Sequence, residues 1–369
     1  MNEHFLDKKL QERTDSSALR SLSINEQKSD TRIDFCSNDY LGIVKNKIIE
    51  KLMAPDFSHG STGSRLLSGN YLLIEDTEKL IARFHDADAG LIFNSGYDAN
   101  TGILSSVPQK NDTIIYDKLS HASLRDGIRL SYATAFSFLH NDLQDLEKKL
   151  SSADSNYQTF VVTESVFSMD GDFAPLEEII NLCEKYNAAL IVDEAHATGV
   201  IGEKGEGLVQ KLNLQKKCFA RIHTFGKACG AHGAIILGSE KLRKYLINFS
   251  RQFIYSTALP PSAIEAIAIS YKTFPEMKDE RNHLSELISI FQKSRLKYHI
   301  LQSETPIQIV IIPGNEEVKK IAKNLQENNF DIRAILYPTV PKGQERLRIV
   351  LHAFNIVEEV EEVVKILKG

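Results

Sequence analysis

Short β-rich runs alternate with helical stretches from about Ala89 onward, and this alternation constrains the fold more than any other feature. Several of the runs are apolar on both faces, as strands buried in a parallel sheet are. The predicted strands are Leu91–Phe93, Ile114–Tyr116, Phe160–Thr163, Ala189–Asp193, Ile222–Thr224 and Ala234–Leu237. Apolar residues at helical spacing after Pro175 predict a crossover helix between two of them. The pattern therefore predicts an α/β domain with a mostly parallel sheet flanked by helices.

The pattern changes near Phe274-Pro275, where a charged helical stretch begins. Further strands are predicted at Ile307–Ile312, Asp331–Ile335 and Leu347–Leu351, with a helix from about Glu316 and a final helix carrying Val360, Val363, Val364 and Leu367 on one face. The first 45 residues are polar with weak periodicity. We therefore expect an N-terminal arm (1–45), a large domain (46–274) and a smaller C-terminal α+β domain (275–369).

Charge and cysteine content exclude several functional classes. The chain has 44 Lys and Arg residues against 49 Asp and Glu residues, a net charge of −5, so nucleic acid is not an expected partner. Its four cysteines form no C-x-x-C pair, which argues against a disulfide framework and a zinc cluster, and no metal is expected. The N-terminus has no apolar signal region, and no stretch approaches the ~18 apolar residues of a membrane span. These features predict a cytoplasmic protein without membrane attachment.

A carboxylate ends one of the predicted strands, in the sequence Asp193-Glu194-Ala195-His196. A carboxylate at the C-terminal end of a buried parallel strand points into the crevice where α/β sheets bind ligands, although a helix N-cap is an alternative. The same four letters occur in nucleic-acid helicases, whose chemistry also requires a G-x-x-x-x-G-K-[ST] phosphate loop upstream. This chain has no such loop, which excludes the helicase interpretation.

A lysine follows another predicted strand, in the sequence Thr224-Phe225-Gly226-Lys227. An isolated lysine is usually solvated. A lysine able to form a Schiff base, together with a carboxylate able to hold a pyridine nitrogen protonated, is however the pair that pyridoxal phosphate requires. The presence of Asp193 and Lys227 together therefore favours a pyridoxal-phosphate site over either residue's ordinary interpretation.

A phosphate cradle is predicted at Asn94-Ser95-Gly96-Tyr97, between the strand Leu91–Phe93 and a helical stretch through Leu104. Free backbone N–H groups and the helix dipole favour an anion there, and Ser95 and Thr224 can add hydroxyl donors. Taken alone, a Ser-Gly pair in a loop is more often a turn.

Eight ordered motifs carry a resemblance to a known family. They are Ser37-Asn38-Asp39-Tyr40-Leu41-Gly42, Gly60-Ser61-Thr62-Gly63-Ser64-Arg65, Ser120-His121-Ala122-Ser123, Glu164-Ser165-Val166-Phe167-Ser168-Met169-Asp170-Gly171-Asp172, Asp193 through Gly199, Thr224 through Lys227, Tyr255-Ser256-Thr257 and Pro338-Thr339-Val340-Pro341. From about Leu10 to its C-terminus the chain resembles the α-oxoamine synthases. These are pyridoxal-phosphate enzymes of fold type I that condense an amino acid with an acyl-CoA.

The resemblance implies a role for each matching residue. Lys227 would bind the cofactor covalently, Asp193 would pair with its ring nitrogen, and His121 would stack on its ring. Ser168 and His196 would hydrogen-bond the ring hydroxyl group. The phosphate would be held by Gly96, Tyr97 and Thr224, with Thr257 reaching it from the partner subunit of a homodimer. The substrate contacts would be Arg348, which would bind the amino-acid carboxylate, and Arg20, Asn38 and Thr339.

Other interpretations of these residues stay open at this point. His121 and His196 could be ordinary loop or capping histidines. Arg346 and Arg348 alternate with apolar residues, so a period of two already predicts them on the polar face of a strand.

The resemblance favours L-alanine and pimeloyl-CoA as substrates, in a decarboxylative condensation that yields an aminoketone, as in biotin synthesis. A relative that uses glycine with a short acyl-CoA is the alternative enzyme. A catalytically silent subunit that keeps the fold for partner binding is the alternative outside enzymes.

Overall fold

The computed structural model describes residues 3–20, 22 and 32–369. These residues divide into two interleaved compact units. The large unit comprises Asp39–Ser168 and Phe173–Arg281, and the small unit comprises Met1–Asn38, Met169–Asp172 and Asn282–Gly369. The small unit thus includes the N-terminal segment as well as the C-terminal part of the chain. The domain boundaries expected at residues 45 and 274 stay predictions.

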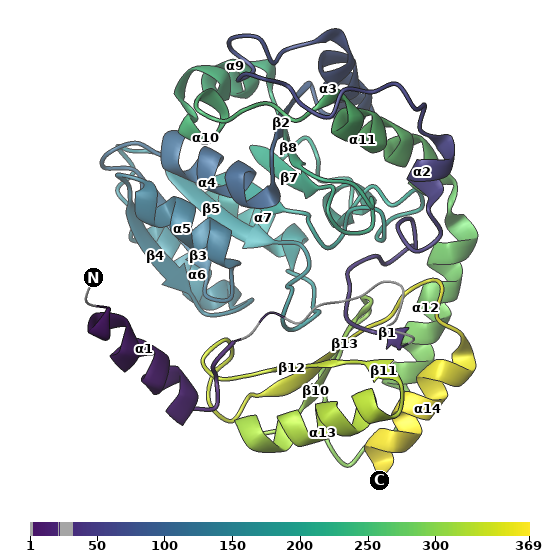
Figure 1. Ribbon diagram of the computed structural model, residues 1–369. Coiled ribbons are helices and arrows are strands. Elements are labelled where there is room, and N and C mark those ends of the chain that lie inside the picture. The colour runs from purple at the N-terminus through teal and green to yellow at the C-terminus, as the bar shows by residue number, and fades with distance from the viewer. Residues whose placement is uncertain (1–2, 21, 23–31) are drawn as a thin grey trace. The chain divides into compact units, whose positions relative to one another are not determined.

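The large unit contains a seven-stranded sheet of the order β2-β8-β7-β6-β5-β3-β4 (Figure 1). Its strands are β2 (Ala89–Phe93), β3 (Thr113–Asp117), β4 (Thr134–Phe138), β5 (Thr159–Glu164), β6 (Ala189–Asp193), β7 (Ala220–Thr224) and β8 (Ala234–Gly238). Strands β4, β3, β5, β6 and β7 run parallel, and β8 is antiparallel to both of its neighbours. The mostly parallel sheet and all six predicted strands are therefore confirmed.

The sequence did not predict β4, the edge strand of this sheet. Its first four residues are exposed and only Phe138 is buried, so it lacks the continuous apolar run that marks the central strands. Strand β5, by contrast, is buried along its whole length.

Helices connect the strands of the large unit and cover both faces of the sheet. They are α2 (Ile48–Leu52), α3 (Leu72–Phe84), α4 (Gly96–Ser106), α5 (Ala122–Leu130), α6 (Leu143–Ser151), α7 (Leu176–Lys185), α8 (Leu208–Lys211), α9 (Glu240–Phe249), α10 (Arg251–Ile254), α11 (Pro261–Thr273) and the 3-10 turn η1 (Phe274–Glu276). Helix α7 is the predicted crossover helix. Helix α12 (Lys278–Gln292) leads into the small unit.

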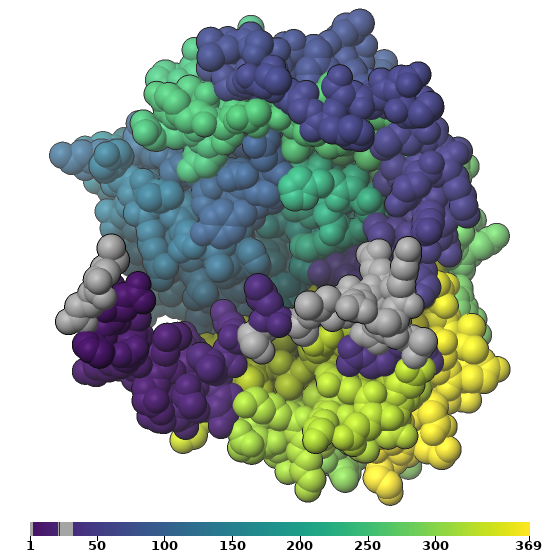
Figure 2. Space-filling model, in the orientation of Figure 1, coloured from purple at the N-terminus to yellow at the C-terminus, as the bar shows by residue number. Residues whose placement is uncertain are grey.

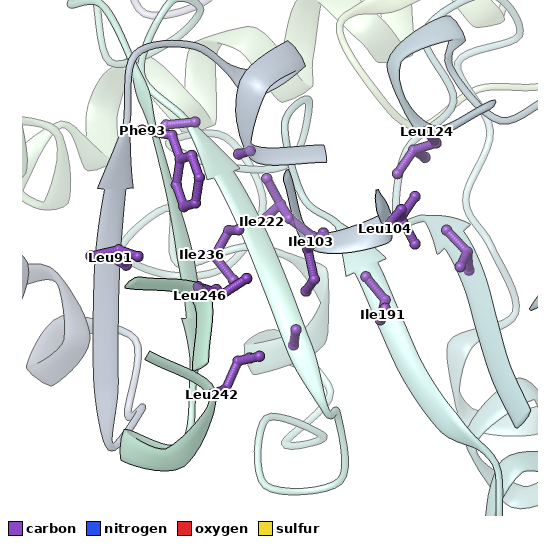
Figure 3. Close-up of a cluster of buried hydrophobic side chains, with 14 of the residues drawn as sticks. Leu91, Phe93, Ile103, Leu104, Leu124, Ile191, Ile222, Ile236, Leu242 and Leu246 are labelled. Carbon is purple, nitrogen blue, oxygen red and sulfur yellow. The ribbon is translucent and has the colours of Figure 1, made fainter. Parts of the chain in front are cut away.

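One face of the sheet carries a continuous apolar core beneath α4, α5, α9 and α10. Figure 3 shows Ile191, Ile222 and Ile236 on the strands, with Ile103 and Leu104 of α4 among the side chains packed on them. Residues two apart on a strand share a face, so the strand positions that follow these apolar residues by two also face α4 and α5.

The small unit contains a four-stranded antiparallel sheet of the order β12-β13-β10-β9. Its strands are β9 (His299–Ile300), β10 (Ile307–Ile311), β12 (Arg333–Ile335) and β13 (Arg346–Val350), and β1 (Ile33–Asp34) pairs in parallel with β11 (Phe330–Asp331). Helices α13 (Asn315–Glu327) and α14 (Val357–Lys368) complete the unit. The four apolar residues predicted on one face of the last helix are buried.

The N-terminal segment begins with helix α1 (His4–Asp15), none of whose residues is buried. Figure 2 shows this helix in dark purple on the molecular surface. Residues 21 and 23–31 of the predicted arm lie outside the described residues. Among the described residues, no helix combines the length and the hydrophobicity needed to cross a lipid bilayer.

The buried carboxylate of Glu78 connects α3 to neighbouring elements of the large unit. Glu78 is 2% exposed and accepts hydrogen bonds from Arg65 Nη1 at 2.7 Å and Arg243 Nη2 at 2.8 Å. Its Oε1 also accepts from the backbone N–H of Ile92 on β2 at 2.9 Å. One carboxylate therefore satisfies donors from a loop, a helix and a strand.

We predict that Glu78→Ala lowers the free energy of unfolding by about 3 kcal/mol, because Arg65 and Arg243 then keep only Glu75 as a partner and the buried N–H of Ile92 loses its acceptor. Chemical denaturation followed by circular dichroism measures the change. Asp76→Ala is the matched control on the same helix, since Asp76 pairs with Lys79 at the surface and its loss costs at most about 1 kcal/mol. Equal losses in the two variants would contradict the prediction.

Candidate active site

Three polar side chains end neighbouring strands on the same face of the large sheet. Glu164 and Asp193 are register partners at the ends of β5 and β6, and Thr224 ends β7. Each follows by two positions a residue of the apolar core under α4 and α5. The strand period therefore turns all three side chains toward those helices. This is the carboxyl edge of the sheet, where α/β proteins bind ligands.

Asp193 is 4% exposed and held by two donors. Its Oδ1 accepts from the backbone N–H of Ala195 at 2.9 Å, and its Oδ2 accepts from Asn100 Nδ2 at 2.7 Å. The two bonds hold this buried carboxyl group in one orientation at the end of β6.

His121 caps the N-terminus of α5 beside this carboxylate. Its backbone N–H donates to Glu164 Oε1 at 2.6 Å, and its Nδ1 lies 2.8 Å from Ser123 Oγ. Burial lowers the pKa of His121, and the positive charge of Lys227 lowers it further while Asp193 opposes the shift. The capping role foreseen as an alternative is thus real, and the same ring lies within electrostatic reach of both Asp193 and Lys227.

Lys227 lies in a tight turn between β7 and β8. Its carbonyl oxygen accepts from the N–H of Gly230 at 2.8 Å, and Phe225 exchanges backbone hydrogen bonds of 2.8–2.9 Å with Ala231 and Gly233. Gly230 has φ +60°, and a Cβ there would lie 2.6 Å from Ile43 Cγ2, so a larger residue would displace the turn. The half-buried Lys227 also acts electrostatically on Glu164. The lysine therefore lies within electrostatic reach of Glu164 and His121.

The predicted phosphate cradle lies at the N-terminus of α4. Ser95 caps the helix through the N–H of Asp98, and the first intrahelical bond is donated by Ala99, so the N–H groups of Gly96 and Tyr97 precede the helical ladder.

Thr224 of β7 lies against this helix end. A Cβ on Gly96 would lie 2.5 Å from Thr224 Cγ2, so only glycine leaves the space open. Thr224 Oγ1 is buried and, among the described residues, lacks a hydrogen-bond partner. Two N–H groups that precede the helical ladder and an unpartnered hydroxyl group are suited to binding a phosphate.

The remaining predicted cofactor residues have other surroundings. His196 is 6% exposed, with Nδ1 2.7 Å from the Tyr40 hydroxyl group. Ser168 is half-buried at the end of the large unit. Thr257 is exposed, and its carbonyl oxygen accepts from Asn94 Nδ2 at 2.8 Å. This last contact places the Thr257 backbone beside the phosphate cradle of its own chain.

The four predicted substrate residues form two pairs in the small unit. Arg348 of β13 donates from Nη2 to Asn38 Oδ1 at 2.9 Å. Arg20 donates from Nη2 to Thr339 Oγ1 at 3.0 Å. Both members of the second pair are exposed, whereas Arg348 and Asn38 are half-buried. The pairs join positions about three hundred residues apart, which a period-two pattern cannot reveal.

Sequence reasoning missed three residues of this site. Asn100 donates a hydrogen bond to Asp193, and the Tyr40 hydroxyl group contacts His196. Glu164 accepts a hydrogen bond from the backbone N–H of His121. Glu164 and Tyr40 lie within motifs noted in the sequence, and Asn100 lies one helical turn after Gly96. A polar residue on the buried face of a predicted helix is the signal that could have identified Asn100.

Comparisons with known proteins identify the family. The model for aminotransferase class I and II matches residues 30–367. An 8-amino-7-oxononanoate synthase of Emericella nidulans is 40% identical over 380 residues, covering 95% of this chain and 92% of its own. The structure of 8-amino-7-oxononanoate synthase from Francisella tularensis is 30% identical with a TM-score of 0.78, covering 92% and 98% of the two chains. Serine palmitoyltransferase of Sphingomonas wittichii is 27% identical with a TM-score of 0.89, covering 99% and 96%.

The chain belongs to the aminotransferase class I and II family, whose members are pyridoxal-phosphate enzymes of fold type I. Within that family it is similar to proteins named 8-amino-7-oxononanoate synthase. The residues present fit the cofactor, because the site combines a lysine, a buried carboxylate and an open cradle with an unpartnered hydroxyl group. The roles of the individual residues stay predictions.

Glu164 provides a test of the electrostatics of the site. Burial and the neighbouring Asp193 raise the pKa of Glu164 well above its ordinary value of 4.5. The folded state therefore holds this proton more tightly than the unfolded state, and the resulting stabilisation is lost as the pH rises through the folded pKa. Glu164→Gln keeps an acceptor for His121 and removes the titration.

We predict that the Tm of Glu164→Gln relative to wild type rises as the pH increases above about 4.5. Thermal unfolding at a series of pH values measures the difference. Glu147→Gln is the control, because a hydrogen bond from Lys185 lowers the pKa of Glu147, so its titration lies below about pH 4.5 and its Tm difference should stay constant above that pH. A Tm difference between Glu164→Gln and wild type that stays constant from pH 4.5 to 8 would refute the assigned protonation.

Proposed function

We propose that the protein condenses L-alanine with pimeloyl-CoA, releasing CoA and CO₂ and forming an α-aminoketone with a terminal carboxylate. The observation that carries this proposal is the meeting of Lys227, Asp193 and His121 at one edge of the sheet, beside an open phosphate cradle. Relatives at 37–40% identity are named as synthases of that aminoketone. The reaction belongs to biotin synthesis.

Pyridoxal phosphate, when bound, supplies an electron sink for negative charge at Cα of the amino acid. The carboxylate of Asp193 maintains that sink, since a buried negative charge raises the affinity of the ring nitrogen for its proton. Lys227 would hold the cofactor covalently, and its Nζ would accept the proton from Cα of the amino acid. The ring of His121 would pack against the bound cofactor and orient it.

The phosphate is held by the N–H groups of Gly96 and Tyr97 and by the hydroxyl group of Thr224. Ser168 and His196 bind the ring hydroxyl group, and Tyr40 orients His196 through its Nδ1. These contacts fix the ring before the substrates arrive, which lowers the entropic cost of the reaction.

Arg348 is the proposed ligand of the alanine carboxylate, with Asn38 holding the guanidinium group in place. A guanidinium fork matches a carboxylate with two parallel hydrogen bonds. Arg20 and Thr339 are proposed as further substrate contacts, and their exposure allows either to turn toward a ligand.

We also propose a homodimer in which Thr257 contributes to the partner's phosphate site. Thr257 forms a backbone bridge with Ser64, close in sequence to Leu66 and Leu67, which are 50% and 85% exposed. Large exposed apolar side chains of this kind are typical of a surface covered by another subunit. Analytical ultracentrifugation of the purified protein measures the state directly.

Two alternatives remain as outcomes of experiment. The likeness to serine palmitoyltransferase covers 99% of this chain, so the fold also accommodates another amino acid and a long acyl chain. Glycine with a short acyl-CoA is the other enzymatic alternative. A silent subunit is disfavoured by the presence of Lys227, Asp193 and His121 together.

We predict that borohydride reduction places a pyridoxyl group on Lys227 alone, and that Lys227→Ala abolishes the adduct without changing the fold. Peptide mass mapping measures the adduct, and circular dichroism measures the fold. Lys241→Ala, on the exposed start of α9, is the control and should label as wild type does. An adduct on another lysine of the wild-type protein would show that the assignment is wrong.

We predict that L-alanine with pimeloyl-CoA gives the highest kcat/KM in a matrix of alanine, glycine and serine against pimeloyl-, succinyl-, acetyl- and palmitoyl-CoA. One methyl group is worth only about 1–3 kcal/mol, so the preference for alanine over glycine should be incomplete. The distal acyl carboxylate should matter more, because a site built to pair it rejects a neutral chain. A lead for glycine with acetyl-CoA, or for serine with palmitoyl-CoA, would reassign the substrate.

A further inference from the structure

Asn100 connects two predicted catalytic residues that lie on different elements. It lies on α4, is 2% exposed, and uses one amide nitrogen for two contacts. Its Nδ2 lies 2.7 Å from Asp193 Oδ2 on β6 and 2.9 Å from Ser123 Oγ on α5. Both hydrogens of the amide group are therefore engaged.

The carboxylate of Asp193 fixes which way this amide group points. An ionised carboxylate only accepts hydrogen bonds, so the reversed amide would place two oxygens 2.7 Å apart. The observed orientation leaves Asn100 Oδ1 buried without a hydrogen-bond partner among the described residues. Burying an unsatisfied carbonyl group costs stability. The two hydrogen bonds that Asn100 donates are therefore kept at the expense of an unpaired Oδ1.

Ser123 lies between Asn100 and His121 and contacts both side chains. Its hydroxyl group accepts from Asn100, which leaves its single hydrogen available to His121 Nδ1, 2.8 Å away. The backbone N–H of Ser123 also donates to this nitrogen, at 3.2 Å. A neutral His121 ring that faces two donors at Nδ1 must carry its proton on Nε2.

Gly127 makes the chain of contacts sterically possible. A Cβ at this position of α5 would lie 2.9 Å from the carbonyl oxygen of Asn100 and 3.0 Å from Leu104 Cβ. Glycine therefore lets α5 approach α4 closely. Ser123 lies one helical turn before Gly127, so the same approach brings its hydroxyl group to the Asn100 amide.

We propose that Asn100 is a positioning residue that couples Asp193 to His121, fixing the carboxylate directly and, through Ser123, setting the His121 tautomer with the proton on Nε2. Its consequence for catalysis rests on the proposed function, because it matters only where His121 packs on the cofactor. The neutral form that the tautomer requires agrees with the lowered pKa of His121.

Nuclear magnetic resonance of the full-length protein, labelled with ¹⁵N-histidine and loaded with pyridoxal phosphate, tests the tautomer. The chain has 11 histidines, and His121→Gln identifies the signal. We expect a protonated Nε2 and an unprotonated Nδ1 in wild type. Ser123→Ala should make the His121 ring bind its second proton about fivefold more tightly, because the neutral ring loses the hydrogen bond that the Ser123 hydroxyl group donates to it. Asn100→Ala should shift this proton affinity in the same direction.

A second readout separates the two halves of the coupling. Of Asn100 and Ser123, Asn100 is the one that donates to Asp193. Asn100→Ala should therefore change the pH dependence of the cofactor absorbance spectrum, whereas Ser123→Ala should leave it as in wild type. Thr101→Val is the control, because Thr101 is buried on α4 but bonds within its own helix. The charged groups that act on His121 are the same in every variant; they are Asp193, Lys227, Arg125 and Asp126. Differences between the variants therefore report the hydrogen bonds that join Asn100, Ser123 and His121.

A protonated Nδ1 in wild type, or a His121 titration unchanged in Ser123→Ala, would overturn the proposal. If Asn100→Ala fails to fold, Asn100→Leu keeps the approximate size of the side chain and removes the donors without adding a charge. Repeating the measurement without cofactor keeps this test separate from the proposed function, since the His121 tautomer stays measurable in a protein that binds no pyridoxal phosphate.

Discussion

The parallel register of β5, β6 and β7 is the constraint on which the site depends. It aligns Glu164 with Asp193 and places Thr224 on the next strand, all at the carboxyl edge and on one face. Two carboxylates held side by side in a buried sheet repel each other. Burial and this repulsion raise the pKa of Glu164 well above its ordinary value, which favours its neutral form beside Asp193. One register therefore brings the two carboxyl groups together and sets the electrostatics of the site.

The opposite face of the same strands carries a separate polar set. Arg221 and His223 alternate with Ile222, and His223 stacks on His85 with ring centroids 3.9 Å apart. Burial lowers the pKa of both imidazoles far below 6.5, so neither brings a charge into the interior. Arg221 instead donates to the carbonyl oxygen of His85 at 2.6 Å. The sheet thus separates polar groups that support packing from those predicted to bind the cofactor.

The sequence predicted the parts of this fold that depend on local pattern. Central strands and the residues that end them follow from apolar runs, so Asp193 and Lys227 were identifiable, whereas the exposed edge strand β4 was not. Asn100 and Tyr40 were missed for another reason. Their roles arise from contacts with residues 93 and 156 positions away, which no local period encodes. The pairing of Arg348 with Asn38 was hidden in the same way.

The residues predicted to handle the cofactor and those predicted to bind the substrate lie in different units of this chain. Lys227, Asp193 and His121 belong to the large unit, whereas Arg348, Asn38, Arg20 and Thr339 belong to the small unit. An arginine that binds a carboxylate treats alanine, glycine and serine alike, because the group it recognises is common to all three. Selectivity must then come from contacts with the amino-acid side chain and the acyl chain. A contact to the common carboxylate is therefore compatible with a fold shared over almost the whole chain with a relative whose name, serine palmitoyltransferase, specifies a different amino acid and acyl group.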